Sequence, residues 1–215
     1  MVEPVDVIRA FHNAFRVDMA RIDTAALNLA RGVQDPDPNP DIERFRFFNE
    51  VLVWHADGEE KGIFPALETV APLVAEAYVK DHRGLDSVYL ALNNAVSAGD
   101  TLETARATAA FRFHLKMHLA KEDTHLYRIF RERIALPEQR NAMNIMAGAV
   151  PRERFPELVI WMFPLIGNDD REHVTRTWQM VLPPPVFNGV KGLIKKAIGG
   201  NDWVELTRRI PALEE

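Results

Sequence analysis

The chain contains no cysteine, which excludes disulfides, thiolate metal ligands and a cysteine nucleophile. It also lacks a run of about 18 apolar residues, which a membrane-spanning helix requires. The early acidic residues Glu3 and Asp6 do not fit a signal peptide. The formal net charge is -5 and no basic tract is longer than Lys195–Lys196, so a nucleic-acid partner is not expected. We therefore expect a soluble cytoplasmic protein without a membrane or nucleic-acid partner.

Four segments within residues 1–135 carry apolar side chains at helical spacing, over about residues 5–30, 40–69, 72–99 and 100–134. The proline-rich loop 35–40 cannot continue a helix, and Pro40 suits the first turn of the next one. Gly99 predicts the end of the third helix, and Asp100 with Glu103 predicts a cap for the fourth. Short connections favour an all-α fold, an antiparallel four-helix bundle over residues 1–135.

Residues 136–215 differ in composition from the rest of the chain. Prolines divide this region into short segments, and it holds three of the four tryptophans, namely Trp161, Trp178 and Trp203. Its apolar stretches are too short to enclose a core of their own. We therefore expect a C-terminal extension of short helices that packs on the bundle.

A histidine and a glutamate recur four residues apart, as His55 with Glu59 and as His118 with Glu122. Residues at this spacing lie on one face of a helix, one turn apart. The two segments also agree beyond these pairs, because Glu59-Glu60-x-x-Ile63-Phe64 aligns with Glu122-Asp123-x-x-Leu126-Tyr127. Each segment therefore offers an imidazole and a carboxylate to one point in space, and the pattern indicates a helix pair used twice.

The helix that precedes each motif carries one histidine on its apolar face, His12 in the first pair and His82 in the second. Buried charge is costly unless it is paired or bound to a metal. Imidazole and carboxylate without sulfur suit iron, manganese or zinc, and carboxylates that can bridge suit two ions. The alternative is a set of buried hydrogen bonds between histidines and glutamates.

The order His, His-x-x-x-Glu, His, His-x-x-x-Glu resembles the hemerythrin-like (HHE cation-binding) family over about residues 5–132. A single H-x-x-x-E is weak evidence, whereas the ordered set of six is specific. The resemblance implies a left-handed four-helix bundle around a non-haem centre of two iron ions. The metal ligands that it implies are His12, His55, His82 and His118 as terminal ligands, with Glu59 and Glu122 as bridges.

The chain departs from the family on the third helix. Classical hemerythrins place two histidines one turn apart there, but this chain has only His82, with Tyr78 and Asp86 one turn to either side. His114, one turn before His118, is the first substitute, followed by Asp86, Tyr78 or a solvent molecule. The departure favours redox chemistry or sensing over reversible oxygen carriage. The two remaining histidines are His125, expected at the rim of the site, and His173, expected outside it.

Two glycines stand near candidate ligands inside predicted helices, Gly58 beside Glu59 and Gly84 close to His82. Each costs about 1 kcal/mol relative to alanine in a helix interior. Either they let a partner helix or a small ligand approach closely, or they mark a local distortion of the helix near a loop.

These features predict a di-iron protein that binds or reacts with dioxygen, peroxide or nitric oxide, with catalase- or peroxidase-like turnover as one version. Two other hypotheses belong to different classes: a binding module that senses iron or oxygen, and a structural metal site. Zinc or manganese are the alternative metals. Binding without turnover and catalysis stay open alternatives, as do a monomer and a homo-oligomer.

Overall fold

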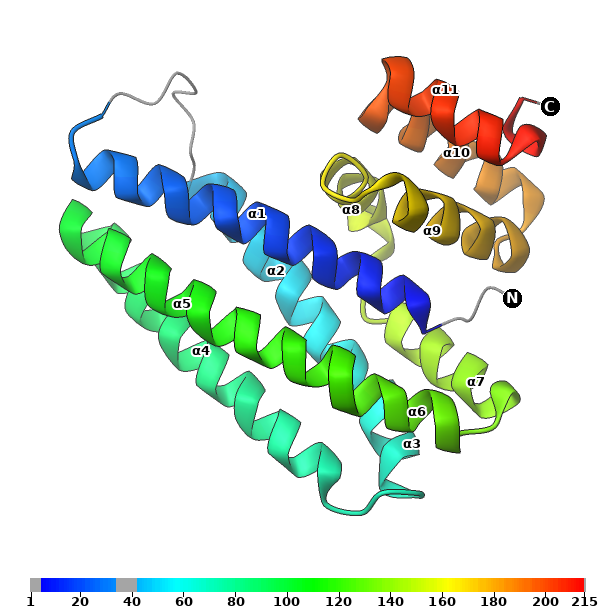
Figure 1. Cartoon of the computed structure of the whole chain (residues 1–215), viewed down its shortest axis with the longest axis horizontal. Coiled ribbons are helices and arrows are strands. Elements are labelled where there is room, and N and C mark those ends of the chain that lie inside the picture. Colours follow the sequence, from blue (N-terminus) through cyan, green and yellow to red (C-terminus); the bar gives the residue numbers. More distant parts are fainter. Residues whose placement is uncertain (1–4, 34–41, 215) are drawn as a thin grey trace. The chain divides into compact units, whose positions relative to one another are not determined.

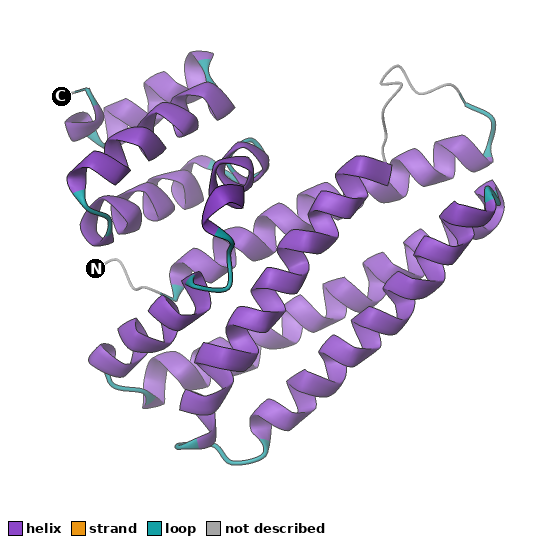
Figure 2. Ribbon diagram, turned by 180° about the vertical axis from the view of Figure 1, so that it is seen from behind, coloured by secondary structure: helices purple, strands orange, loops and turns teal. Residues whose placement is uncertain are grey.

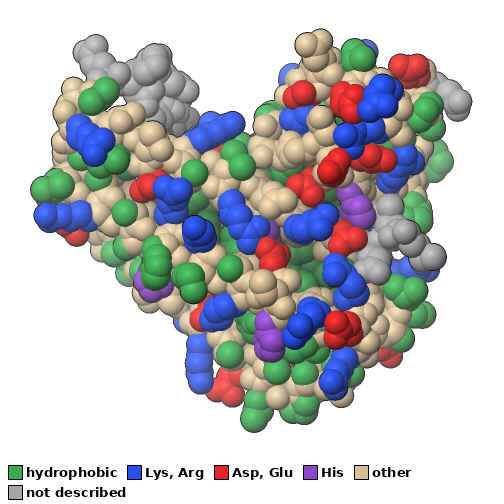
Figure 3. All heavy atoms as spheres, in the orientation of Figure 1, with side chains coloured by type: hydrophobic (Ala, Val, Ile, Leu, Met, Phe, Trp, Pro, Cys, Tyr) green, Lys and Arg blue, Asp and Glu red, His purple; other side chains and the backbone are tan. Residues whose placement is uncertain are grey.

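The computed structural model describes residues 5–33 and 42–214 (Figure 1). The predicted loop 35–40 and the predicted helix start at Pro40 lie outside these residues. All regular structure in the described part of the chain is helical, without a strand (Figure 2), which confirms the all-α class. Each helix in these ranges is too short or too polar to cross a lipid bilayer. On the face shown in Figure 3, acidic and basic side chains are interspersed.

The chain divides into two compact units, residues 18–149 and residues 1–17 with 150–215. Helix α1 (Asp6–Ala30) is continuous, and its residues from Asp18 onward count with the first of these units. The boundary expected after residue 135, and the packing of the extension on the bundle, stay predictions.

The unit of residues 18–149 contains the second part of α1 and most of the long helices. Its other α-helices are α2 (Ile42–Gly58), α3 (Phe64–Glu68), α4 (Val74–Ala98), α5 (Thr101–Lys121), α6 (Tyr127–Arg133) and α7 (Leu136–Ala147). Gly99 ends α4 in the left-handed region with φ 69°, and the Asp100 side chain accepts a hydrogen bond from the backbone N–H of Glu103. The predicted stop and cap are thus confirmed, and the short link makes α4 and α5 neighbours (Figures 1 and 2).

Aromatic side chains join the long helices of this unit. Phe45 of α2 lies 5.3 Å from the ring centroid of Tyr89 on α4 and 5.9 Å from that of Phe111 on α5. Arg44 of α2 donates from Nε to the buried Asp18 of α1 over 2.7 Å. These contacts bring helices from all four predicted segments together, while the closed antiparallel bundle stays a prediction.

Two π-helical turns interrupt the predicted second and fourth helices. The first, η1 (Glu59–Ile63), lies between α2 and α3, and the second, η2 (Glu122–Leu126), lies between α5 and α6. The predicted helices are present, and a local distortion of the helix beside Gly58 was one of the two interpretations of that glycine. Each turn begins at one of the two repeated glutamates, and single π-turns inside α-helices are frequent at functional sites.

The second unit combines the start of α1 with the C-terminal region. Its elements are η3 (Arg152–Arg154), α8 (Phe155–Met162), α9 (Asn168–Val181), α10 (Pro184–Ile198), α11 (Gly200–Arg209) and η4 (Pro211–Leu213). Phe163, Val174 and Ile194 are fully buried, and Ala10 and Ala14 of α1 belong to the same apolar cluster. The short helices predicted between the prolines are present, and the share of α1 in their core was not predicted.

Candidate metal centre

All six side chains of the repeated pattern are buried. None of them is more than 5% exposed, a set made up of His12, His55, Glu59, His82, His118 and Glu122. Lys, Glu and Asp residues are rarely buried without a partner, so two fully buried glutamates among histidines require an explanation.

Five of these side chains lie together within residues 18–149. Glu59, His82, His118 and Glu122 each offer one ligand atom, and the four atoms lie within 4.8 Å of one another. His55 meets the same criterion with the same two glutamates. Donors on opposite sides of one ion, bound at about 2.1 Å, lie about 4.2 Å apart. The observed spacing of the donor atoms is thus close to the spacing expected around a bound ion. Both glutamates belong to the group that contains His55 and to the group that contains His82 and His118.

His12 lies on α1 and is fully buried. It belongs to the part of α1 that counts with the other compact unit. That His12 binds a metal ion together with His55, Glu59 and Glu122 stays a prediction.

The distances follow the expected pairing along each helix. His55 Nε2 lies 3.3 Å from Glu59 Oε1, and His118 Nε2 lies 3.2 Å from Glu122 Oε1. His82 Nε2 lies 3.4 Å from Glu59 Oε2, yet neither of these two buried atoms has a hydrogen-bond partner. Buried polar atoms without hydrogen bonds are rare in proteins. A cation held between them would satisfy both, so the donor set fits a metal ion.

The two glutamates respond differently to their surroundings. Burial by itself raises the pKa of both carboxyls. For Glu59 the imidazoles of His55 and His82 outweigh burial, and its pKa falls well below the usual value. For Glu122 the negative charge of Glu59 adds to burial and its pKa rises well above the usual value. Bound cations would remove the conflict between the two charges and let both carboxyls ionise.

An outer carboxylate orients one of the histidines. Glu60 Oε1 lies 2.9 Å from His82 Nδ1, which leaves Nε2 directed toward Glu59. Burial lowers the pKa of His82, but the nearby carboxylates of Glu59 and Glu60 outweigh burial and raise this pKa above its usual value. A carboxylate on the second nitrogen is the usual support of a metal-binding histidine. The sequence analysis noted Glu60 within the repeat but did not predict this role.

The buried Tyr127 hydroxyl donates a hydrogen bond to Glu59 Oε1. Burial and the charges of Glu59 and Glu122 raise the pKa of Tyr127 well above its usual value, so the phenol stays protonated and acts as a donor. Tyr127 connects the two halves of the repeat, because it directly follows η2 and its hydroxyl donates to Glu59, the proposed metal ligand in η1. The sequence analysis missed this residue, although Tyr127 replaces Phe64 of the first segment, and that difference was the available signal.

The structure does not bring the candidate substitutes for the missing histidine into the centre. His114 is exposed, because the buried stripe through Phe111 and Leu115 leaves it on the flank at about 100° per residue. The Asp86 side chain is 63% exposed. Tyr78 is buried, but its hydroxyl lies 3.0 Å from His125 Nδ1, and burial with the charges of Glu122 and Asp81 raises its pKa to about 12. Neither His114 nor Asp86 belongs to the donor groups of histidine and carboxylate side chains found among the described residues.

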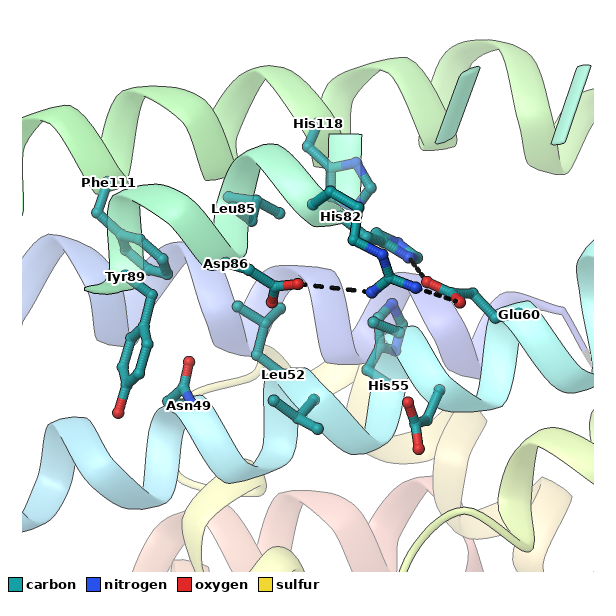
Figure 4. Close-up of a pocket in the computed structure, with 14 residues that line it drawn as sticks. Asn49, Leu52, His55, Glu60, His82, Leu85, Asp86, Tyr89, Phe111 and His118 are labelled. Atoms are coloured by element: carbon teal, nitrogen blue, oxygen red, sulfur yellow. Dashed lines mark hydrogen bonds and ion pairs between the residues drawn. The ribbon is translucent and has the colours of Figure 1, made fainter. Parts of the chain in front are cut away.

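A pocket of about 170 Å³ opens beside the centre (Figure 4). His55, His82 and His118 line it, as do the charged side chains of Glu60 and Arg83. The remaining lining residues include the apolar or aromatic side chains of Leu52, Leu85, Tyr89 and Phe111. The pocket therefore has room for several water molecules or a small ligand beside three candidate metal ligands.

The chain is similar to three proteins of Arabidopsis thaliana. It is 24% identical to Zinc finger protein BRUTUS over 188 residues, which cover 85% of this chain and 15% of that protein. It is 22% identical to Zinc finger protein BRUTUS-like At1g74770 over 213 residues, or 86% of this chain and 17% of that protein. The identity to Zinc finger protein BRUTUS-like At1g18910 is 23% over 205 residues, or 86% of this chain and 16% of that protein.

The chain thus spans 15 to 17% of the length of these curated relatives. No family model matches it, and no solved structure matches it. Because the chain has no cysteine, it holds no cysteine-ligated zinc finger of its own. Its candidate metal centre is built from histidine and glutamate alone.

Proposed function

We propose that this chain is a hemerythrin-like, non-haem di-iron protein whose centre binds a small oxidant such as dioxygen, peroxide or nitric oxide. The observation that carries the proposal is the pair Glu59 and Glu122, which are both fully buried and common to two donor groups. Two carboxylates shared in this way suit two adjacent ions. The proposed ligands are His12, His55, His82 and His118, with Glu59 and Glu122 as bridges.

The choice of iron rests on the donor chemistry. Imidazole nitrogens and carboxylate oxygens without thiolate suit iron, with zinc and manganese as alternatives. When bound, a pair of iron ions supplies redox capacity and a Lewis-acidic position for a small ligand. The residues of the chain supply the rest: Glu60 orients His82, and Tyr127 holds Glu59.

The pocket supports a small ligand over a large one. Three proposed iron ligands line it, and its volume of about 170 Å³ has room for a small ligand beside them. Arg83 joins Glu60 over 3.2 Å and Asp86 over 3.5 Å on the charged side of this pocket (Figure 4). Leu52, Leu85 and Phe111 give the pocket apolar surface, which suits a small neutral molecule.

Metal analysis of the protein tests the proposal. After anaerobic loading with Fe(II) and exposure to air, we expect two iron ions per chain and a near-ultraviolet absorption band. One ion or none would overturn the di-iron proposal, and a colourless protein that retains only zinc would support a structural site. Addition of peroxide then separates two versions of the function. Continued consumption of peroxide indicates turnover, whereas a spectral change without consumption indicates a binding or sensing module.

A further inference from the structure

Helix α7 packs directly on the π-turn that carries Glu59. A Cβ atom added at Gly58 would lie 2.6 Å from Met146 Cγ and 2.9 Å from the Met146 carbonyl oxygen. One added at Gly62 would lie 2.4 Å from the Ala142 carbonyl oxygen. Separations below 3.0 Å are essentially never seen for real Cβ atoms. Glycine at both positions is therefore what allows the backbone of α7 to reach this turn.

The start of α7 is itself anchored. The buried Gln139 donates from Nε2 to the carbonyl oxygens of Ile134 over 2.8 Å and of Arg131 over 3.3 Å. These oxygens lie at the end of α6, which begins with Tyr127, and the hydroxyl of Tyr127 donates to Glu59. Glu59 is thus held at its carboxylate by Tyr127, while α7 packs on Gly58 and Gly62 of the same turn.

We infer that α7 is the positioning element of Glu59, acting through the contacts of Ala142 and Met146 with Gly62 and Gly58. The inference rests on the proposed role of Glu59 as a shared metal ligand. A single π-turn is a rare conformation that requires support from its surroundings. Gly58 and Gly62 are four residues apart and flank Glu59, so α7 holds the outer face of the turn while the carboxylate points into the centre.

The second π-turn has no equivalent glycines. Lys121 and His125 occupy the positions of Gly58 and Gly62, and both are exposed. The support by α7 is thus specific to Glu59, and a change in this contact acts on one of the two shared carboxylates.

The experiment compares Gly58→Ala and Gly62→Ala with Gly84→Ala as the matched control. Gly84 also lies inside a helix, two residues after His82, but a Cβ there meets nothing within 4 Å. We expect the variants at Gly58 and Gly62 to bind at least one iron ion about 10- to 100-fold more weakly, as for other supports of metal ligands. Their near-ultraviolet band should shift as well. The Gly84→Ala protein should keep the affinity and spectrum of the wild type.

A second change separates positioning from general destabilisation. Met146→Ala removes the Cγ atom at 2.6 Å from a Cβ at Gly58 but leaves the Met146 carbonyl oxygen at 2.9 Å, so it should restore part of the affinity lost in Gly58→Ala. It should not rescue Gly62→Ala, because the obstacle there is the backbone oxygen of Ala142. If a glycine variant fails to fold, Gln139→Ala loosens the start of α7 without entering the turn, and the same selective loss is expected.

Wild-type affinity and spectrum in Gly58→Ala, Gly62→Ala or Gln139→Ala would overturn the inference. So would an equal loss in the Gly84→Ala control. A wild-type protein that binds no pair of ions would instead overturn the proposed function. The failure of one proposal is therefore distinguishable from the failure of the other.

Discussion

The two π-turns carry equivalent glutamates but are held in different ways. Around η1, the backbone of α7 lies against Gly58 and Gly62. Around η2, the equivalent positions carry long polar side chains that reach α4. Lys121 forms an ion pair with Asp81, and His125 meets the Tyr78 hydroxyl. The repeat thus keeps its donors and its unusual backbone while the supports of the two turns differ.

The pKa values of the two glutamates also differ. Glu59 lies beside two imidazoles, which hold its pKa well below the usual value against the effect of burial. Burial and the negative charges of Glu59, Asp123 and Asp81 hold the pKa of Glu122 well above the usual value. Sequence symmetry therefore does not imply equal pKa values, and without metal Glu59 ionises more readily than Glu122.

The largest expected effect comes from Glu59→Ala and Glu122→Ala. If both carboxylates are shared, each variant should lose both ions together, because neither donor group remains complete. Elemental analysis should show less than one iron per chain. The thermal stabilisation by iron should vanish too, a loss of about 4 kcal/mol at a metal concentration 1,000 times Kd. If one variant keeps one ion at wild-type affinity, the carboxylates act separately.

The pH dependence of the metal-free protein sharpens the contrast between the glutamates. The pKa of Glu122 is higher in the folded state than in the unfolded state. Its contribution to stability is therefore fully present below about pH 4.5, the ordinary pKa, and is lost as the pH rises through the folded-state pKa. His82, also raised, acts in the same direction above its ordinary value of 6.5. Glu59, whose pKa is lowered, is ionised in both states at these pH values and adds no slope.

Urea unfolding of metal-free protein between about pH 5 and 8 should therefore show a free energy of unfolding that falls as the pH rises. Glu122→Gln should flatten this fall and raise stability near neutral pH, while the part due to His82 remains. A free energy that rises over this range in the wild type would contradict the assignment of the raised pKa to Glu122.

A smaller effect is expected from the two tyrosines that contact the turns. Tyr127→Phe removes a buried hydrogen bond to Glu59 and should lower the free energy of unfolding by about 1–3 kcal/mol. Tyr78→Phe removes the hydroxyl's hydrogen bond to the Lys121 carbonyl oxygen and its contact with the exposed His125, and should cost about 1 kcal/mol. Equal losses in the two variants, measured by urea unfolding, would show that the two turns are supported equally.

The smallest effect is expected at His125. It is exposed and lies outside both donor groups. His125→Ala should change the free energy of unfolding by roughly 0.5 kcal/mol or less and leave the iron content at two per chain. A loss of iron in this variant would give η2 a ligand that the geometry does not assign.

The sequence predicts much of this molecule because its signals are local. Helical spacing, Gly99 and Asp100 predict the helices and their ends, and the His-x-x-x-Glu repeat predicts which side chains gather. The π-turns could not be predicted in the same way, since a π-turn depends on what packs against it. Gly58 carried a usable signal, because one of its two interpretations was the close approach of a partner helix, and α7 is that partner.

His114 shows where local reasoning fails. At about 40° per step of four residues, it lies close to the face of His118 by sequence. The buried stripe of α5, however, continues through Leu115 and Phe111 on the other side of His118, and His114 is left exposed. The direction of the core relative to a helix face is a tertiary property that spacing along one helix does not contain.

Magnetic measurement of the oxidised, iron-loaded protein tests the central claim most directly, namely that two ions share Glu59 and Glu122. Ions bridged by common carboxylates lie close together and couple their spins, so we predict two ferric ions per chain with an antiferromagnetically coupled ground state. The coupling should be absent from protein loaded with zinc. Two independent high-spin ferric signals, or one isolated ion per chain, would contradict the account.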